Sequence, residues 1–118
     1  MLEWDIRTWR HDGCLEPLYD IENRENEIIV TIDLPYVSKD NIKVYATEDI
    51  LEVTAEMRSA VSWERWGSIQ RRITFSRFRK QIRLPEKVNP DEASATFRNG
   101  VLRITLPKVR RQVSIKVE

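Results

Sequence analysis

The chain is poor in the residues that most enzymes and metal sites depend on: one cysteine, one histidine and three glycines in 118 residues. The lone Cys14 excludes an internal disulfide and a multi-cysteine metal site, and it fits a reducing compartment. With glycine only at positions 13, 67 and 100, the glycine-rich loops that bind nucleotide phosphates are absent. His11 and Cys14 are close in sequence, but closeness alone makes no catalytic dyad. We therefore expect no enzyme, no cofactor and no metal site.

Long apolar runs and an excess of one charge sign are missing too. No stretch approaches the ~20 apolar residues that cross a bilayer, and residues 1–5 lack the regions of a signal peptide. We therefore expect a cytoplasmic protein with no membrane partner. With 20 basic and 19 acidic side chains the net charge is +1, which argues against a dedicated nucleic-acid binder. The dense mixed charge suits a thermophilic surface.

What the sequence has in abundance is alternation of apolar and polar residues with a period of two. Such alternation with one polar face is typical of antiparallel strands that are solvated on one side. Proline donates no ladder hydrogen bond, so Pro35, Pro85 and Pro107 each mark the end of a strand. The sequence predicts an all-β, antiparallel β-sandwich. The alternating apolar positions are Ile28, Val30, Ile32, Leu34, Ile42, Val44, Ala46, Leu51, Val53, Ala55, Met57, Leu102, Ile104 and Leu106.

Three regions fall outside this pattern. An N-terminal arm, residues 1–16, precedes the sandwich of residues 17–107, and three of its apolar residues would share one side of a short helix. Residues 58–74 interrupt the strands with two tryptophans among charges. A tail, residues 108–118, begins with a polar linker, after which Val113, Ile115 and Val117 alternate as a final strand. The apolar residues of the arm are Leu2, Trp4, Ile6 and Trp9, and the tryptophans of the interruption are Trp63 and Trp66.

A basic run between Arg71 and Arg83 contains no acid and could be taken as a nucleic-acid patch. The period of two disfavours that interpretation, because it places Arg79 with other arginines on a solvated strand face. Lys80 points the other way, with Phe78 and Ile82. A lysine on an apolar face needs a carboxylate partner, because an unpaired buried charge is very costly.

Two segments in the C-terminal part of the chain carry a family resemblance. Residues Ala95 to Leu102 read A-T-F-R-N-G-V-L, and Ile115-Lys116-Val117 follows after the polar linker. Asn99-Gly100 also predicts a tight turn, because both residues tolerate positive φ. Together the segments resemble the alpha-crystallin domain of small heat-shock proteins. Asp33-Leu34-Pro35 resembles the family's D-L-P turn, with Tyr36 in place of its usual glycine.

The resemblance implies a fold, a function and partners. The fold is the immunoglobulin-like sandwich of the alpha-crystallin domain. The function is that of an ATP-independent holdase chaperone, which binds partly unfolded client proteins and suppresses their aggregation. The chain would form dimers by strand exchange, and tails would join dimers into higher oligomers. An archaeal or thermophilic type is expected. A CS-type co-chaperone on a similar sandwich is the alternative, although that class lacks a docking tail.

The same resemblance assigns roles to particular residues. The tail would dock through two same-side apolar residues into a groove on a neighbouring subunit, as in β-strand addition at a sheet edge. Lys80 would form ion pairs at the dimer interface, next to the two tryptophans of the interruption. The arm would hold clients. The docking residues are Ile115 and Val117, the groove residues are Ile42, Val44, Ala93 and Ala95, the dimer residues are Trp63, Trp66 and Lys80, and the client residues are Leu2, Trp4, Ile6 and Trp9.

Each assignment has a plainer alternative. The tail could be the last strand of its own sandwich or a frayed end. The groove residues could be ordinary core positions, and the tryptophans and the arm could pack locally on their own sandwich.

Overall fold

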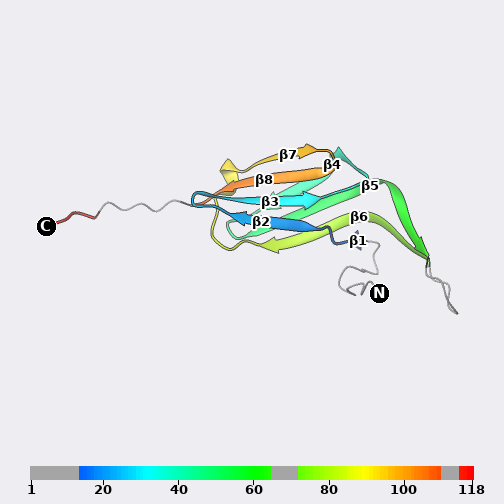
Figure 1. Ribbon diagram of the computed structural model, residues 1–118, viewed down its shortest axis with the longest axis horizontal. Coiled ribbons are helices and arrows are strands. Elements are labelled where there is room, and N and C mark those ends of the chain that lie inside the picture. Colours follow the sequence, from blue (N-terminus) through cyan, green and yellow to red (C-terminus); the bar gives the residue numbers. More distant parts are fainter. Residues whose placement is uncertain (1–13, 65–71, 110–114) are drawn as a thin grey trace.

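The computed structural model describes residues 14–64, 72–109 and 115–118, and nearly all regular structure in them is β. Figure 1 shows two layers of strands, with β5 and β6 continuing beyond them as a hairpin. The elements are β1 (Cys14–Leu15), β2 (Tyr19–Asn23), β3 (Glu27–Asp33), β4 (Val37–Ala46), β5 (Ile50–Glu64), β6 (Arg72–Arg83), the 3-10 turn η2 (Pro90–Glu92), β7 (Ser94–Arg98) and β8 (Val101–Pro107).

The strands form two four-stranded sheets. One has the order β1-β6-β5-β4 and the other has the order β2-β3-β8-β7. Every pairing is antiparallel except that of β1 with β6, which is parallel. The predicted all-β sandwich is thereby confirmed.

The alternating apolar residues form the core between the sheets. Burying one aliphatic side chain of this kind contributes roughly 1.5–3 kcal/mol, so the alternation is the main source of the fold's stability. Ile29 is also buried although it lies on the other face of β3, between Glu22 and Thr105 on the neighbouring strands. The fully buried core side chains of the two sheets include Ile28, Val30, Ile32, Leu34, Leu51, Val53, Ile104 and Leu106.

The turn between β7 and β8 confirms the Asn-Gly prediction. Asn99 and Gly100 have φ values of 51° and 77°, the left-handed conformation that a tight hairpin of this kind requires. Tyr36, where the family pattern has glycine, also has a positive φ, 65°. Its carbonyl accepts a hydrogen bond from the Arg58 amide at 2.6 Å, which holds the strained turn against β5.

Replacing Tyr36 with glycine should stabilise the sandwich. A left-handed conformation costs a residue with a Cβ about 1–2 kcal/mol, and the extra freedom of glycine in the unfolded chain offsets roughly half of this. We expect Tyr36→Gly to raise the free energy of unfolding by about 0.5–1 kcal/mol in urea titrations. Tyr45→Gly is the matched control. Tyr45 is similarly exposed, 62% against 56% for Tyr36, but lies within β4, where glycine should destabilise by about 1 kcal/mol. Loss of stability in both variants would contradict the argument.

Two sequence predictions about strand limits need correction. Residues 58–74 do not simply interrupt the strands, because β5 extends to Glu64 and β6 begins at Arg72. The pairing of β5 with β6 continues past a bulge between Glu56 and Val61. The sequence did not indicate this extension because ladder hydrogen bonds join backbone groups and need no alternation of side chains. Residues 115–118 belong to no strand of this chain, so the predicted final strand is not part of its own sandwich.

Candidate functional site

The chain closes one edge of the sandwich with β1, the outermost strand beside β6, and with the residues that lead from β1 to β2. Residues 14–17 cross from one sheet to the other, with β1 paired to Arg77 and Phe78 of β6. Cys14 and Pro17 are buried, and Leu15 packs against the core. The sequence missed this strand because two residues are too short to show any periodicity.

Lys80 lies on this closed edge, on the face that the alternation predicted. It pairs in register with buried Val53 of β5, so it points toward the core side. Its Nζ lies 3.5 Å from Oε2 of Glu16, and both side chains are only 21% exposed. The same Nζ lies 5.2 Å from the centre of the Tyr19 ring. The required carboxylate partner therefore comes from the same chain, where only the three-dimensional fold could identify it.

The opposite edge of the sandwich, formed by β4 and β7, is open. Each sheet begins at the closed edge, with β1 in one and β2 in the other, and the outermost strands at its opposite side are β4 and β7. On β4, Ile42 and Val44 pair in register with buried Ala55 and Val53, so they point inward. Both nevertheless remain only half-buried.

Ala95 shows this opening most clearly. It pairs in register with buried Ile104 of β8, so it too points to the core side, yet it is exposed. Half-buried Ala93 and Phe97 flank it and pack against the core. An inward-pointing side chain that is exposed means that no described residue fills the space in front of it. The four predicted groove residues therefore lie on β4 or on and just before β7, the two strands of what we call the open edge, and Ala46 and Phe97 lie beside them on the same strands. The open edge consists of Ile42, Val44, Ala46, Ala93, Ala95 and Phe97.

The two predicted docking residues in the tail are almost fully exposed to solvent. Ile115 is 83% exposed and Val117 is 92% exposed. The open edge and the tail are thus two apolar surfaces of one chain, and neither buries the other.

The remaining predicted site residues are less fully described. Trp63 lies in β5, opposite Ile73 of β6 in the long hairpin. Trp66 and the arm residues Leu2, Trp4, Ile6 and Trp9 lie outside the described residues.

The arginines of β6 form the solvated face that the sequence predicted. Arg77, Arg79 and Arg83 are all exposed. Arg79 lies 3.6 Å from Glu52, and Arg77 is opposite Glu56 in register. Neighbouring acids on β5 therefore balance part of this basic run, which does not suit a phosphate-binding surface.

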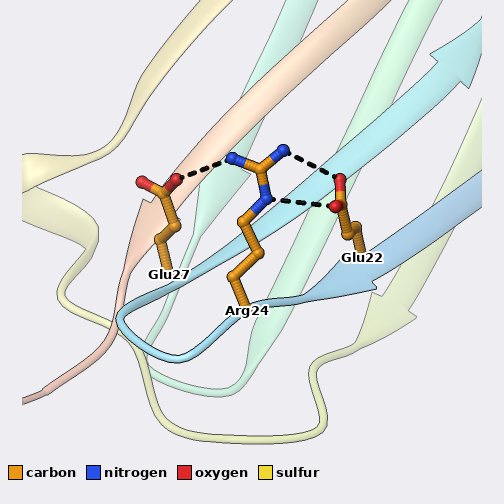
Figure 2. A network of polar contacts seen from close by, with 3 residues as sticks. All are labelled: Glu22, Arg24 and Glu27. Atoms are coloured by element: carbon orange, nitrogen blue, oxygen red, sulfur yellow. Dashed lines mark hydrogen bonds and ion pairs between the residues drawn. The ribbon is translucent and has the colours of Figure 1, made fainter.

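A second charged group lies at the turn between β2 and β3. Figure 2 shows Arg24 between Glu22 and Glu27. Nε of Arg24 lies 3.1 Å from Oε1 of Glu22, and its Nη1 lies 3.3 Å from Oε1 of Glu27. The hydrogen bond and charge of Glu22, and then those of Glu27, raise the pKa of Arg24. The three side chains are 35% to 55% exposed to solvent, so the network orders the turn and contributes little to stability.

Among the described residues, no three His, Cys, Asp or Glu side chains are grouped as a metal ion would require. That part of the chain also has no helix long and apolar enough to cross a membrane.

Comparison with known proteins gives a consistent result. A family model described as Hsp20/alpha crystallin family matches residues 20–118. Heat shock protein 16 of Schizosaccharomyces pombe is 31% identical in an alignment 115 positions long, which covers 88% of this chain and 78% of that protein. The small heat shock protein, chloroplastic, of Pisum sativum is 30% identical over 98 residues, which are 83% of this chain but only 41% of that protein.

Solved structures agree with the sequence comparison. The structure of Heat shock protein 16.0 from Schizosaccharomyces pombe has a TM-score of 0.62 and 28% identity to this chain, and it covers 86% of this chain and 99% of its own. The relatives come from varied organisms, so the expected archaeal or thermophilic type is not supported.

Proposed function

Because this chain belongs to the Hsp20/alpha-crystallin family, we propose that it acts as an ATP-independent holdase chaperone in the cytoplasm. It binds partly unfolded proteins and suppresses their aggregation. No catalytic step is involved, since the chaperone works by competitive burial. Apolar surface that subunit contacts cover in the assembly becomes available to clients when those contacts open.

The open edge is the observation that carries this proposal. The chain closes one edge of its sandwich with its own residues 14–17 and leaves inward-facing apolar residues accessible at the other. An extended peptide with apolar side chains at every second position can add to such an edge as a strand. The tail presents that pattern in Ile115 and Val117. A tail from a neighbouring subunit is therefore the natural occupant, and it would link dimers into larger assemblies.

The dimer itself is assigned to the β5–β6 side of the molecule. The long hairpin that carries Trp63 projects beyond the two layers (Figure 1), which suits contact with a second subunit. Trp66 belongs to the same interface, because tryptophan is enriched among residues that dominate interface energetics. Lys80 would contribute its charge from the adjoining closed edge. A CS-type module has no equivalent for the exposed tail pair.

The arm is the proposed client site. Leu2, Trp4, Ile6 and Trp9 form a concentrated apolar group, which a chain retains when an oligomer or a partner covers it. Each such side chain can contribute roughly 1.5–3 kcal/mol when it is buried against a client.

A heated model client provides the test. The parent chain should suppress the client's light scattering with no nucleotide added, and failure to do so would refute the holdase function itself. The triple variant Trp4→Ser, Ile6→Ser, Trp9→Ser should lose most of this protection while keeping its β signal in circular dichroism. Asp5→Ser, Arg7→Ser, Thr8→Ser alters the polar positions of the same arm and should protect like the parent. Full protection by the first variant would move the client site to the open edge.

A further inference from the structure

Several contacts hold the point where the C-terminal tail leaves the sandwich. β8 ends at Pro107, and the next two residues, Lys108 and Val109, form what we call the tail root. The Lys108 amide donates to the Asn26 carbonyl at 2.9 Å, and the Val109 amide donates to the Lys87 carbonyl at 3.2 Å. Lys108 also forms an isolated antiparallel bridge with Val88. The root is thus tied to two separate loops.

A charged pair adds to these backbone contacts. Nζ of Lys108 lies 2.5 Å from Oε2 of Glu86, and the lysine side chain is only 12% exposed although it lies at the end of the last strand. The hydrogen bond from Lys108, and then one from Asn23, lower the pKa of Glu86, so its carboxylate is charged at neutral pH. A lysine on the surface would ordinarily extend into water. Here the Lys108 side chain lies against the protein and links the end of β8 to the loop that holds Glu86.

The turn that receives the root is itself ordered. Asn23 is the last residue of β2 and Asn26 lies in the turn to β3, where Arg24 bridges Glu22 and Glu27 (Figure 2). The Arg24 amide donates to the Glu27 carbonyl at 2.9 Å and closes the same turn. The root is therefore tied to a turn that has hydrogen bonds and ion pairs of its own.

We propose that the Lys108–Glu86 pair is a positioning contact that sets the direction in which the tail leaves the sandwich, and thereby which neighbouring open edge the tail reaches. This inference rests on the proposed docking of the tail. Ile115 is six residues beyond Val109, so covalent geometry lets it reach at most about 20 Å from the root. Over that length a change of direction of about 30° displaces the docking residues by about 10 Å, or two strand spacings. A fixed root therefore selects one geometry of assembly, and a loose root permits several.

Removing the pair should change the assembly while the sandwich remains folded. We expect Lys108→Met to broaden the distribution of subunit number by about twofold or more in native mass spectrometry of the full chain, because the root no longer fixes the reach of the tail. Lys108→Arg keeps the charge and should keep the parent distribution. The matched control is Lys87→Met, which removes the neighbouring lysine. The Lys87 side chain is well exposed, and its ion pair with Glu48 is long, at 3.9 Å. This variant should behave like the parent.

A second variant keeps the proposal testable if Lys108→Met folds poorly. Glu86→Gln removes the charge of the exposed partner and leaves the lysine stem in place, so it should broaden the distribution while the β signal of the sandwich in circular dichroism stays that of the parent. A parent-like distribution in Glu86→Gln and in folded Lys108→Met would overturn the proposal. Collapse to the size of the Ile115→Ser, Val117→Ser variant would overturn it too, since the pair would then be needed for docking itself. If the Ile115→Ser, Val117→Ser variant keeps the parent size, the docking of the tail is itself refuted. That outcome is distinct from a failure of the Lys108–Glu86 proposal alone, in which the serine variant is smaller but the Lys108 and Glu86 variants assemble like the parent.

Discussion

Replacing Ile115 and Val117 together with serine should reduce the assembly to dimers while the β-sandwich stays folded. Both side chains are almost fully exposed in the single chain and share one side of the tail, so they have no role in the stability of their own sandwich. Burying the pair at an open edge contributes roughly 3–5 kcal/mol before the cost of ordering the tail. Loss of even half of this weakens each contact more than about tenfold. Light scattering measures the mass, and circular dichroism reports the fold.

The same tail offers its own control. Lys116 and Glu118 alternate with the docking residues and point to the other side of an extended chain. Lys116→Ser with Glu118→Ser should therefore leave the mass unchanged. An unchanged mass in the Ile115, Val117 variant would remove the docking claim.

The acceptor side can be probed on one strand. Ala95→Trp places a large side chain in the space that a docking tail would fill, and it should lower the mass as the tail variant does. Thr96 is the next residue of β7, is also exposed, and pairs with Arg103 on the opposite face. Thr96→Trp should therefore assemble like the parent. Equal masses for the two variants would place the docking site elsewhere.

The core and the turns were predictable because they depend on local pattern. Ile28, Val30 and Ile32 stand at every second position of β3, and the structure buries all three. Asn99-Gly100 specifies a turn by backbone chemistry that needs no distant partner. Lys80 was placed on the apolar face by the same period of two.

What the sequence could not give were the pairings between distant segments. Glu16 and Lys80 are 64 residues apart, and nothing in either segment identifies the other. The same holds for Lys108 and Glu86, which meet only because β8 ends beside the loop before η2. The resemblance placed Ala95 beside a sheet edge. Its exposure follows from the fold, because residues 14–17 close the other edge of the sandwich and leave this one open. The family pattern supplied the open edge, and only the fold shows that the other edge is closed.

Reversing the charge of Lys80 should destabilise the protein far more than reversing that of its neighbour Arg79. Lys80→Glu places a second carboxylate beside Glu16 in a site where both side chains are 21% exposed, and it removes the cation next to Tyr19. Breaking a substantially buried pair in this way costs roughly 2–4 kcal/mol. Arg79 is 51% exposed and lies 3.6 Å from Glu52, so Arg79→Glu should cost about 0–1 kcal/mol. Urea unfolding midpoints at fixed protein concentration provide the comparison.

A charge swap separates the pair from the position. The double variant Glu16→Lys, Lys80→Glu restores an ion pair between the same two sites, so it should recover at least half of the stability that Lys80→Glu loses. Glu16→Lys alone should be destabilising, because it sets two cations against each other on the core side of the closed edge. If the two effects add without recovery, the 3.5 Å contact is not what stabilises this edge. If Lys80→Glu and Arg79→Glu unfold at the same midpoint, the assignment of Lys80 to the inner face of β6 is wrong.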